Sequence, residues 1–110
     1  MQFVTFLPKR FNDGSRVKKS LRASVLDESW REFGGFSLEG PVTGAWVDTD
    51  DGKLYLDQSE RLTIHCENHR LAEAEAFVRR TGRALRQKAM YFEVRYLDGV
   101  RILYISDADD

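Results

Sequence analysis

The stretch Phe33-Gly34-Gly35-Phe36 is the place in this 110-residue chain where a helix gives way to a sheet. Paired glycines permit the positive φ that stops a helix, and an alternating apolar run follows them. Gly44-Ala45-Trp46 and the turn Asp50-Asp51-Gly52 continue that strand-and-turn pattern. None of the three stretches has the spacing of a catalytic or metal-binding motif, so they indicate architecture and leave the chemistry open.

The composition is that of an ordinary globular domain. Hydrophobic residues make up 42% of the chain and charged residues 32%, with two prolines, which excludes a disordered chain. A chain of this length folds around one core. We therefore predict a single domain at 1–105 and an acidic tail at 106–110.

The charge balance and the lone cysteine narrow the class of protein further. A net charge of -1 excludes attraction of the whole molecule to nucleic acid or to an anionic membrane, so only a local patch could provide it. Cys66 has no second cysteine to pair with, which excludes an internal disulfide. The sequence shows neither a signal-peptide pattern nor an apolar run of transmembrane length. We expect a cytoplasmic protein with no membrane partner and no cofactor.

Hydrophobic periodicity predicts strands that alternate with two helices. Strands are expected at Gln2 to Leu7, Phe36 to Val47, Lys53 to Glu67, Ala89 to Arg95 and Val100 to Ile105, and helices from about Arg16 to Phe33 and from His69 to about Gln87. Gly40-Pro41 interrupts the second strand and makes it an edge candidate, because proline cannot donate to a ladder. A break is also expected in the third strand, at Gln58-Ser59-Glu60. Asp98-Gly99 has the chemistry of a short hairpin between the last two strands.

Helical spacing also predicts which residues are buried. The first helix carries two apolar stripes, Val17, Leu21 and Val25 on one and Leu26, Trp30 and Phe33 on the other. The second helix carries Leu71, Ala74, Val78 and Leu85, with Gly82 beside them. Stripes at this spacing pack against a sheet.

The element order is βαββαβ with one added C-terminal strand, which is the order of an α+β, ferredoxin-like sandwich. Right-handed crossovers place both helices on one face of an antiparallel sheet. The face without helices is then expected to carry Phe3, Thr5, Leu7, Thr63, His65 and Tyr91. This set is half apolar, so we expect a second copy of the chain to cover it.

A set of short motifs runs through nearly the whole chain. They are Leu7-Pro8, Asn12-Asp13-Gly14, Phe33-Gly34-Gly35, Gly44-Ala45-Trp46, Gly52, Asp57 and Gln87. In their order and spacing the chain resembles a group of small, uncharacterised bacterial proteins. The resemblance implies a small single domain of the topology above, and it brings no activity with it. Gln87 is followed here by Lys88-Ala89, where we would expect an acidic residue.

The segment His65-Cys66-Glu67-Asn68-His69 holds the usual zinc-ligand types within five residues. In an extended strand, however, His65 and Cys66 face opposite sides and cannot reach one ion without a bulge. We expect no metal site. Alternation places Cys66 with Leu62 and Ile64, so we expect a core thiol and not a nucleophile.

Basic residues gather in two runs, from Lys9 to Arg22 and from Arg79 to Lys88. In the predicted topology the two helices are antiparallel, so both runs lie at one pole, together with the acidic hairpin at 48–51. Two interpretations stay open: the charges compensate one another on a solvated end, or the pole binds an anion or nucleic acid. The anion site would use Arg79, Arg80 and Arg83, with Lys18.

Three classes of function follow. The first is a small oligomeric binding or interaction module without catalysis of its own, because no nucleophile, base and orienting group can be assembled from the sequence. The second is a small enzyme at the pole or on the open sheet face. The third is an anion or nucleic-acid binder at the basic pole, or an RNA binder that uses an aromatic sheet face. The enzyme would use Asp13, His65 or Asp57 as acid or base, with Asn12, Trp46 and Tyr91 positioning the substrate.

We expect the main partner of this chain to be a second copy of itself. The predicted strand Val100 to Ile105 is apolar on both sides, which a solvated edge does not tolerate. We predict a homodimer or a higher homo-oligomer that forms through this strand or through the helix-free face of the sheet.

Overall fold

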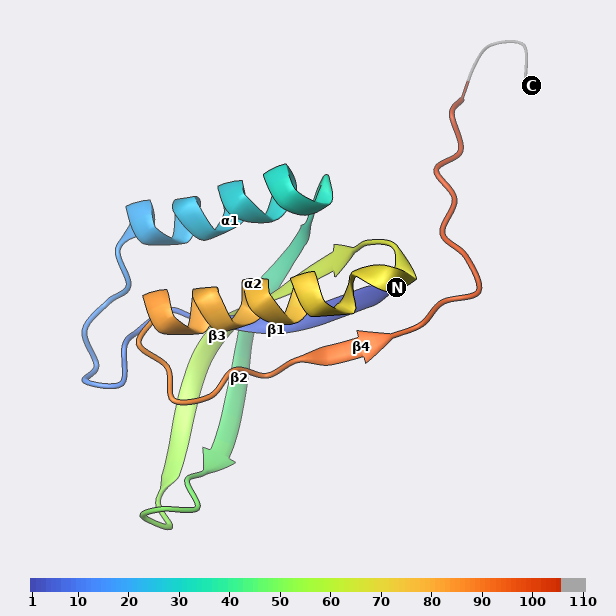
Figure 1. Ribbon diagram of the computed structural model, residues 1–110. Coiled ribbons are helices and arrows are strands. Elements are labelled where there is room, and N and C mark those ends of the chain that lie inside the picture. Colours follow the sequence, from blue (N-terminus) through green and yellow to red (C-terminus); the bar gives the residue numbers. More distant parts are fainter. Residues whose placement is uncertain (106–110) are drawn as a thin grey trace.

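The computed structural model describes residues 1–105 as an antiparallel sheet of four strands with both helices on one of its faces (Figure 1). The elements are β1 (Gln2–Pro8), α1 (Lys19–Phe33), β2 (Ser37–Val47), β3 (Leu54–His65), the 3-10 turn η1 (Asn68–Arg70), α2 (Leu71–Ala84) and β4 (Glu93–Arg95). The strand order is β2-β3-β1-β4. The predicted α+β, ferredoxin-like βαββαβ fold is confirmed.

The central strand β1 turns Phe3, Thr5 and Leu7 toward the helices. The ring of Phe3 packs against Phe33 of α1 at 5.2 Å and against Phe77 of α2 at 6.3 Å. The prediction that Phe3, Thr5 and Leu7 lie on the open face was wrong, because β1 is apolar on both sides and alternation alone cannot orient it. Thr63 and His65 do lie on the helix-free face, opposite Val4 and Gln2 in the register.

Helix α1 begins three residues later than predicted and ends where predicted. Arg16 forms a bridge with Arg10, and the Val17 N–H donates to the carbonyl of Lys9, so this segment is held in extended backbone before Lys19. At the other end Gly34 has φ 91° and its N–H donates to the carbonyl of Trp30. The positive φ explains why glycine ends the helix here.

The core lies between the helices and the sheet. α2 contributes its buried residues Ala74, Phe77, Val78, Thr81 and Gly82, while α1 contributes Val25 and Ser29. Ser29 lies one turn after Val25 and its hydroxyl donates to the Leu26 carbonyl at 2.6 Å. Trp30 follows Ser29 and therefore lies about 100° further around the helix, where it is 47% exposed, so its predicted burial was wrong. Leu26 and Phe33 of the same predicted stripe do pack on the core.

β2 and β3 form a long hairpin that extends away from the helices (Figure 1). The register shifts between Glu39 and Val42, around the cis peptide Gly40-Pro41, whereas β3 is continuous. The predicted break at Gln58-Ser59-Glu60 was therefore wrong. Ser59 is paired with Pro8 on one side and Val42 on the other, so ladder bonds keep this polar run in the strand.

The chain after β4 leaves the body of the molecule (Figure 1). β4 pairs only with Gln2 to Val4, and residues 96–105 form no strand. The predicted hairpin at Asp98-Gly99 and the strand Val100 to Ile105 were wrong, because a three-residue β4 is too short a ladder to template a further strand. The predicted acidic tail at 106–110 lies outside the described residues.

The described residues are more extended than a compact domain of this length. Their radius of gyration is 16.2 Å, and they span 59 × 27 × 22 Å. A compact chain of this size has a radius of gyration of about 13 Å. The hairpin and residues 96–105 account for the difference. In the part of the chain that the structure describes, neither helix has the length and apolar character needed to cross a membrane.

Candidate functional site

A cavity of about 630 Å³ lies between the β2–β3 hairpin and the segment that joins α2 to β4. Its apolar lining includes Phe6, Val42, Trp46, Met90 and Tyr91, and its polar lining includes Asn12, Asp48, Asp50, Asp57, Gln87 and Lys88. This volume is in the range of small-molecule sites, and an apolar wall with a few polar groups is typical of them. We therefore take this cavity as the candidate functional site.

The orientation of Trp46 on β2 is set by its neighbours across the hairpin. Its ring stacks on Tyr55 at 4.9 Å and 20°, and its indole Nε1–H donates to Asp57 Oδ2 at 2.6 Å. The register pairs Trp46 with Tyr55 and Gly44 with Asp57, so these side chains share one face of the hairpin. The indole is thus held in place although it is 42% exposed.

A second aromatic wall lies across the cavity, on β1 and on the segment before β4. The rings of Phe6 and Tyr91 lie 5.1 Å apart. The Tyr91 hydroxyl donates to Glu93 Oε1 at 2.8 Å. This hydrogen bond raises the pKa of Tyr91 above its ordinary value and lowers the pKa of Glu93. Tyr91 is thereby tied to the start of β4.

The charged side chains that line the cavity are mainly acidic. Asp48, Asp50 and Asp57 contribute carboxylates, and Lys88 contributes an ammonium group. Asp48 is buried, accepts the Asp50 backbone N–H at 2.8 Å and pairs with Lys88 Nζ at 3.6 Å. Asp57 is exposed and bound to the Trp46 indole through one oxygen. The electrostatic potential of the cavity therefore favours cations.

Four residues selected from the sequence come together at this cavity: Asn12, Trp46, Asp57 and Tyr91. The lining residues that the sequence did not select include Phe6, Asp48, Gln87 and Lys88. For Asp48, Gln87 and Lys88 a signal was present, because the predicted topology already placed the end of the second helix and the acidic hairpin at the same end of the molecule.

Two candidate acid or base residues do not belong to the cavity lining. Asp13 Oδ1 accepts the backbone N–H and the hydroxyl of Ser15, at 2.9 Å and 2.5 Å. These hydrogen bonds lower the pKa of Asp13, as expected for a turn residue. His65 is exposed at the far end of β3, opposite Gln2. Neither is placed to act together with Asp57.

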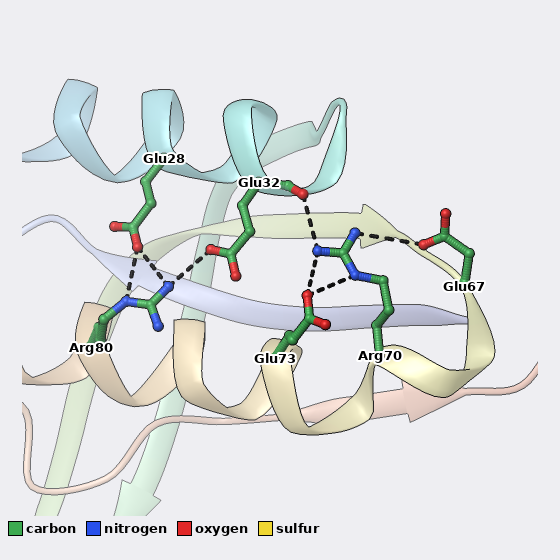
Figure 2. Close-up of polar contacts among 6 residues, drawn as sticks. All are labelled: Glu28, Glu32, Glu67, Arg70, Glu73 and Arg80. Atoms are coloured by element: carbon green, nitrogen blue, oxygen red, sulfur yellow. Dashed lines mark hydrogen bonds and ion pairs between the residues drawn. The ribbon is translucent and has the colours of Figure 1, made fainter.

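The basic residues selected for an anion site are partly neutralised by acids. Figure 2 shows Arg80 of α2 between Glu28 and Glu32 of α1, with contacts of 2.7 Å and 2.9 Å. These carboxylates raise the pKa of Arg80. Arg79 lies 3.8 Å from Glu75. Arg83 lines a second cavity of about 370 Å³, together with Arg79 and Lys88.

Arg70 also connects the two helices (Figure 2). It binds Glu73 Oε2 at 2.5 Å and donates to the Glu32 carbonyl at 3.1 Å. Its guanidinium also lies 4.7 Å from the centre of the Phe33 ring. Arg70 therefore supports the packing of α1 on α2 and does not offer a free charge to a ligand.

The described residues offer little support for metal binding or for a reactive cysteine. Among residues 1–105 no group of three histidine, cysteine or acidic side chains is arranged to hold a metal ion. Cys66 is partly buried against the core, and this burial raises the pKa of its thiol. A raised thiol pKa lowers the fraction of nucleophilic thiolate.

Comparison with known proteins gives structural neighbours only. No family model and no curated protein sequence matches the chain. The structure is similar to a phage SAM lyase in complex with S-methyl-5'-thioadenosine, with a TM-score of 0.63 and 11% identity over 83% of this chain and 76% of that one. It is also similar to the divalent cation tolerance protein Cut A1 from Thermus thermophilus, with a TM-score of 0.64 and 10% identity over 92% and 88%. At these identities the likeness shows the shared α+β fold.

Proposed function

We propose that this chain is a small self-associating binding module, and that the association uses the hairpin and residues 100–105. The observation that carries the proposal is the exposure of large apolar side chains on both segments. On the hairpin, Val47, Leu54 and Leu56 are 58%, 63% and 71% exposed. Val47 pairs with Leu54, and Leu56 pairs with Ala45, so they form one apolar stripe. A stripe of this kind favours a protein contact.

The segment after β4 has the same character. Ile102, Leu103 and Tyr104 are 71%, 76% and 88% exposed, although they belong to an almost continuously apolar run. β2 is an edge strand of the sheet, so one side of its backbone has no ladder partner among residues 1–105. An added strand from a second copy would pair these groups and bury the apolar run.

The helix-free face is less suited to this contact than the sequence suggested. Val4 at its centre is already buried within the chain, and Phe6 packs on Tyr91. Glu93 on this face binds Tyr91 and Arg95. Because Val4 is buried and Glu93 is paired, the proposal rests on the hairpin and residues 100–105. Such a contact can form a closed assembly in two ways: two copies can exchange residues 100–105 in a two-fold dimer, or several copies can form a ring.

The oligomeric state tests the proposal. The variants Ile102→Lys and Leu56→Lys should each give a smaller particle by light scattering at tens of micromolar protein, because each places a charge in the buried contact. The control Ala23→Lys adds the same charge on the exposed face of α1 and should keep the wild-type mass. A wild-type protein that is monomeric under these conditions contradicts the proposal.

The other functions inferred from the sequence stay predictions. Anion or nucleic-acid binding at the basic pole has less support at Arg80, whose charge is compensated by two glutamates. Catalysis at the cavity loses two of its three candidate acid or base residues, because among residues 1–105 neither Asp13 nor His65 lines it. The cytoplasmic location also stays a prediction.

A further inference from the structure

We propose that the cavity between the hairpin and residues 87–91 binds an organic cation that carries a flat apolar group. This inference goes beyond self-association and does not depend on it. It rests on three observations: an aromatic side chain held in position at the wall, an excess of carboxylates, and a carboxylate oxygen that is free to accept a hydrogen bond.

The aromatic wall is already arranged for binding. Tyr55 covers one face of the Trp46 indole and does not belong to the cavity lining, so the cavity is bordered by the rest of that ring. The hydrogen bond to Asp57 favours this orientation of the indole. A ligand therefore loses little free energy in ordering this wall. Tryptophan is also the aromatic side chain that attracts cations most strongly.

The charged residues of the cavity lining indicate that the ligand is positively charged. Three aspartates and one lysine line the cavity, and Lys88 is paired with the buried Asp48. Asp57 uses Oδ2 for the indole, and its Oδ1 has no hydrogen-bond partner among residues 1–105. A cation beside Trp46 would make a cation–π contact with the indole and an ionic contact with this oxygen. A phosphate or carboxylate would be repelled by the aspartates.

The lining comes from parts of the chain that are distant in sequence. Asn12 follows β1, Trp46 and Asp57 lie on the two strands of the hairpin, and Gln87 and Lys88 follow α2. Asn12, Trp46, Asp57 and Gln87 belong to the motifs quoted above for the sequence pattern. Several of these motifs therefore meet at one cavity wall, although none of them would define a site alone.

Nuclear magnetic resonance can test the proposal with an internal control. The protein has two tryptophans, Trp46 at the cavity and Trp30 on the exposed side of α1. Titration with benzyltrimethylammonium should shift the Trp46 indole N–H signal to saturation and leave that of Trp30 unchanged. Benzyl alcohol, which lacks the charge, and phenylacetate, which reverses it, should bind at least 10-fold more weakly, about the loss that a missing cation–π and ionic contact gives.

Substitutions then assign the carboxylate. Asp57→Asn keeps an acceptor for the indole and removes the charge, so affinity for benzyltrimethylammonium should fall about 5-fold to 10-fold, with a weaker dependence on salt. Asp13→Asn removes a carboxylate outside the cavity lining and should leave the affinity unchanged. No saturable shift of Trp46, equal binding of benzyl alcohol, stronger binding of phenylacetate, or an unaffected Asp57→Asn variant would each overturn the proposal.

Discussion

At the scale of single residues, the structure separates side chains that look alike in the sequence. Trp30 and Phe33 both lie on the stripe predicted to be buried, yet only Phe33 contacts the core. Its ring packs edge-on against Phe3 at 5.2 Å and against Phe77 at 5.7 Å. Trp30 instead donates its indole N–H to Asp27 at 3.3 Å on the solvent side. The rotation of α1 about its axis decides between them.

The two residues should therefore differ in their contribution to stability. Phe33→Ala should lower the free energy of unfolding by about 3 kcal/mol, because it removes a ring from an aromatic cluster that cannot easily close the gap. Trp30→Ala should change it by less than about 1 kcal/mol, as for other exposed positions. Denaturant unfolding measures both changes in the free energy of unfolding, provided that its dependence on denaturant concentration is the same for the two variants. Equal losses for the two variants would mean that both rings are buried alike.

At the scale of elements, polar side chains connect segments that periodicity treats separately. Arg80 joins α2 to α1 through half-exposed ion pairs with Glu28 and Glu32, and Arg70 reaches α1 through a hydrogen bond to the Glu32 carbonyl (Figure 2). Such pairs contribute little stability individually, so they orient the helices more than they hold them. In the hairpin, the Tyr55 hydroxyl donates to Asp51 Oδ2 at 2.6 Å, while its ring stacks on Trp46. The turn is thereby linked to the cavity wall.

The hairpin contact should depend on pH in a defined direction. The hydrogen bond raises the pKa of Tyr55 above its ordinary value and lowers the pKa of Asp51. The contact is therefore complete below the ordinary tyrosine pKa and is lost as the pH rises through the raised one; it is also lost when acid protonates Asp51 below the lowered aspartate pKa. An NMR titration of the Tyr55 ring measures this. In Asp51→Asn the tyrosine pKa should fall, and an unchanged value would argue against the contact.

At the scale of the whole molecule, the described residues form a body with two exposed apolar extensions. The body is formed by the two helices on the four-stranded sheet, and the far end of the β2–β3 hairpin and residues 96–105 extend beyond it (Figure 1). A monomer gains nothing from exposing Leu56 or Ile102 to water, because each buried aliphatic side chain is worth about 2 kcal/mol. The proposed self-association would bury both extensions.

Amide hydrogen exchange should reveal whether residues 100–105 pair with a second copy. We expect protection of these amides in the wild-type oligomer and rapid exchange in the Ile102→Lys variant, since an unpaired segment has no ladder hydrogen bonds. Amides of β1 serve as the reference and should stay protected in both proteins. Rapid exchange of 100–105 in a wild-type oligomer would assign the contact to another surface.

The order of elements, the end of α1 and the position of the second strand could be predicted from the sequence, because each depends on near neighbours. Gly34 ends α1 through its own φ, and Leu62 and Ile64 alternate with Thr63 whatever lies beside them. The antiparallel helices of the predicted topology also placed the acidic hairpin beside the end of α2, where Lys88 pairs with Asp48. These features rest on local backbone preference and side-chain period.

The remaining features depend on partners that are distant in the chain, and only the tertiary structure decided them. β1 is apolar on both sides, so packing against Phe33 and Phe77 chose the face on which Phe3 lies. Residues 100–105 have strand-like composition, yet a strand needs a partner for its backbone hydrogen bonds, and the short β4 does not supply one. The cavity likewise exists only because Trp46, Tyr91 and Lys88 meet in space. Hydrophobic periodicity cannot predict these contacts, because it describes the side chains of one segment and not which other segments pack against it.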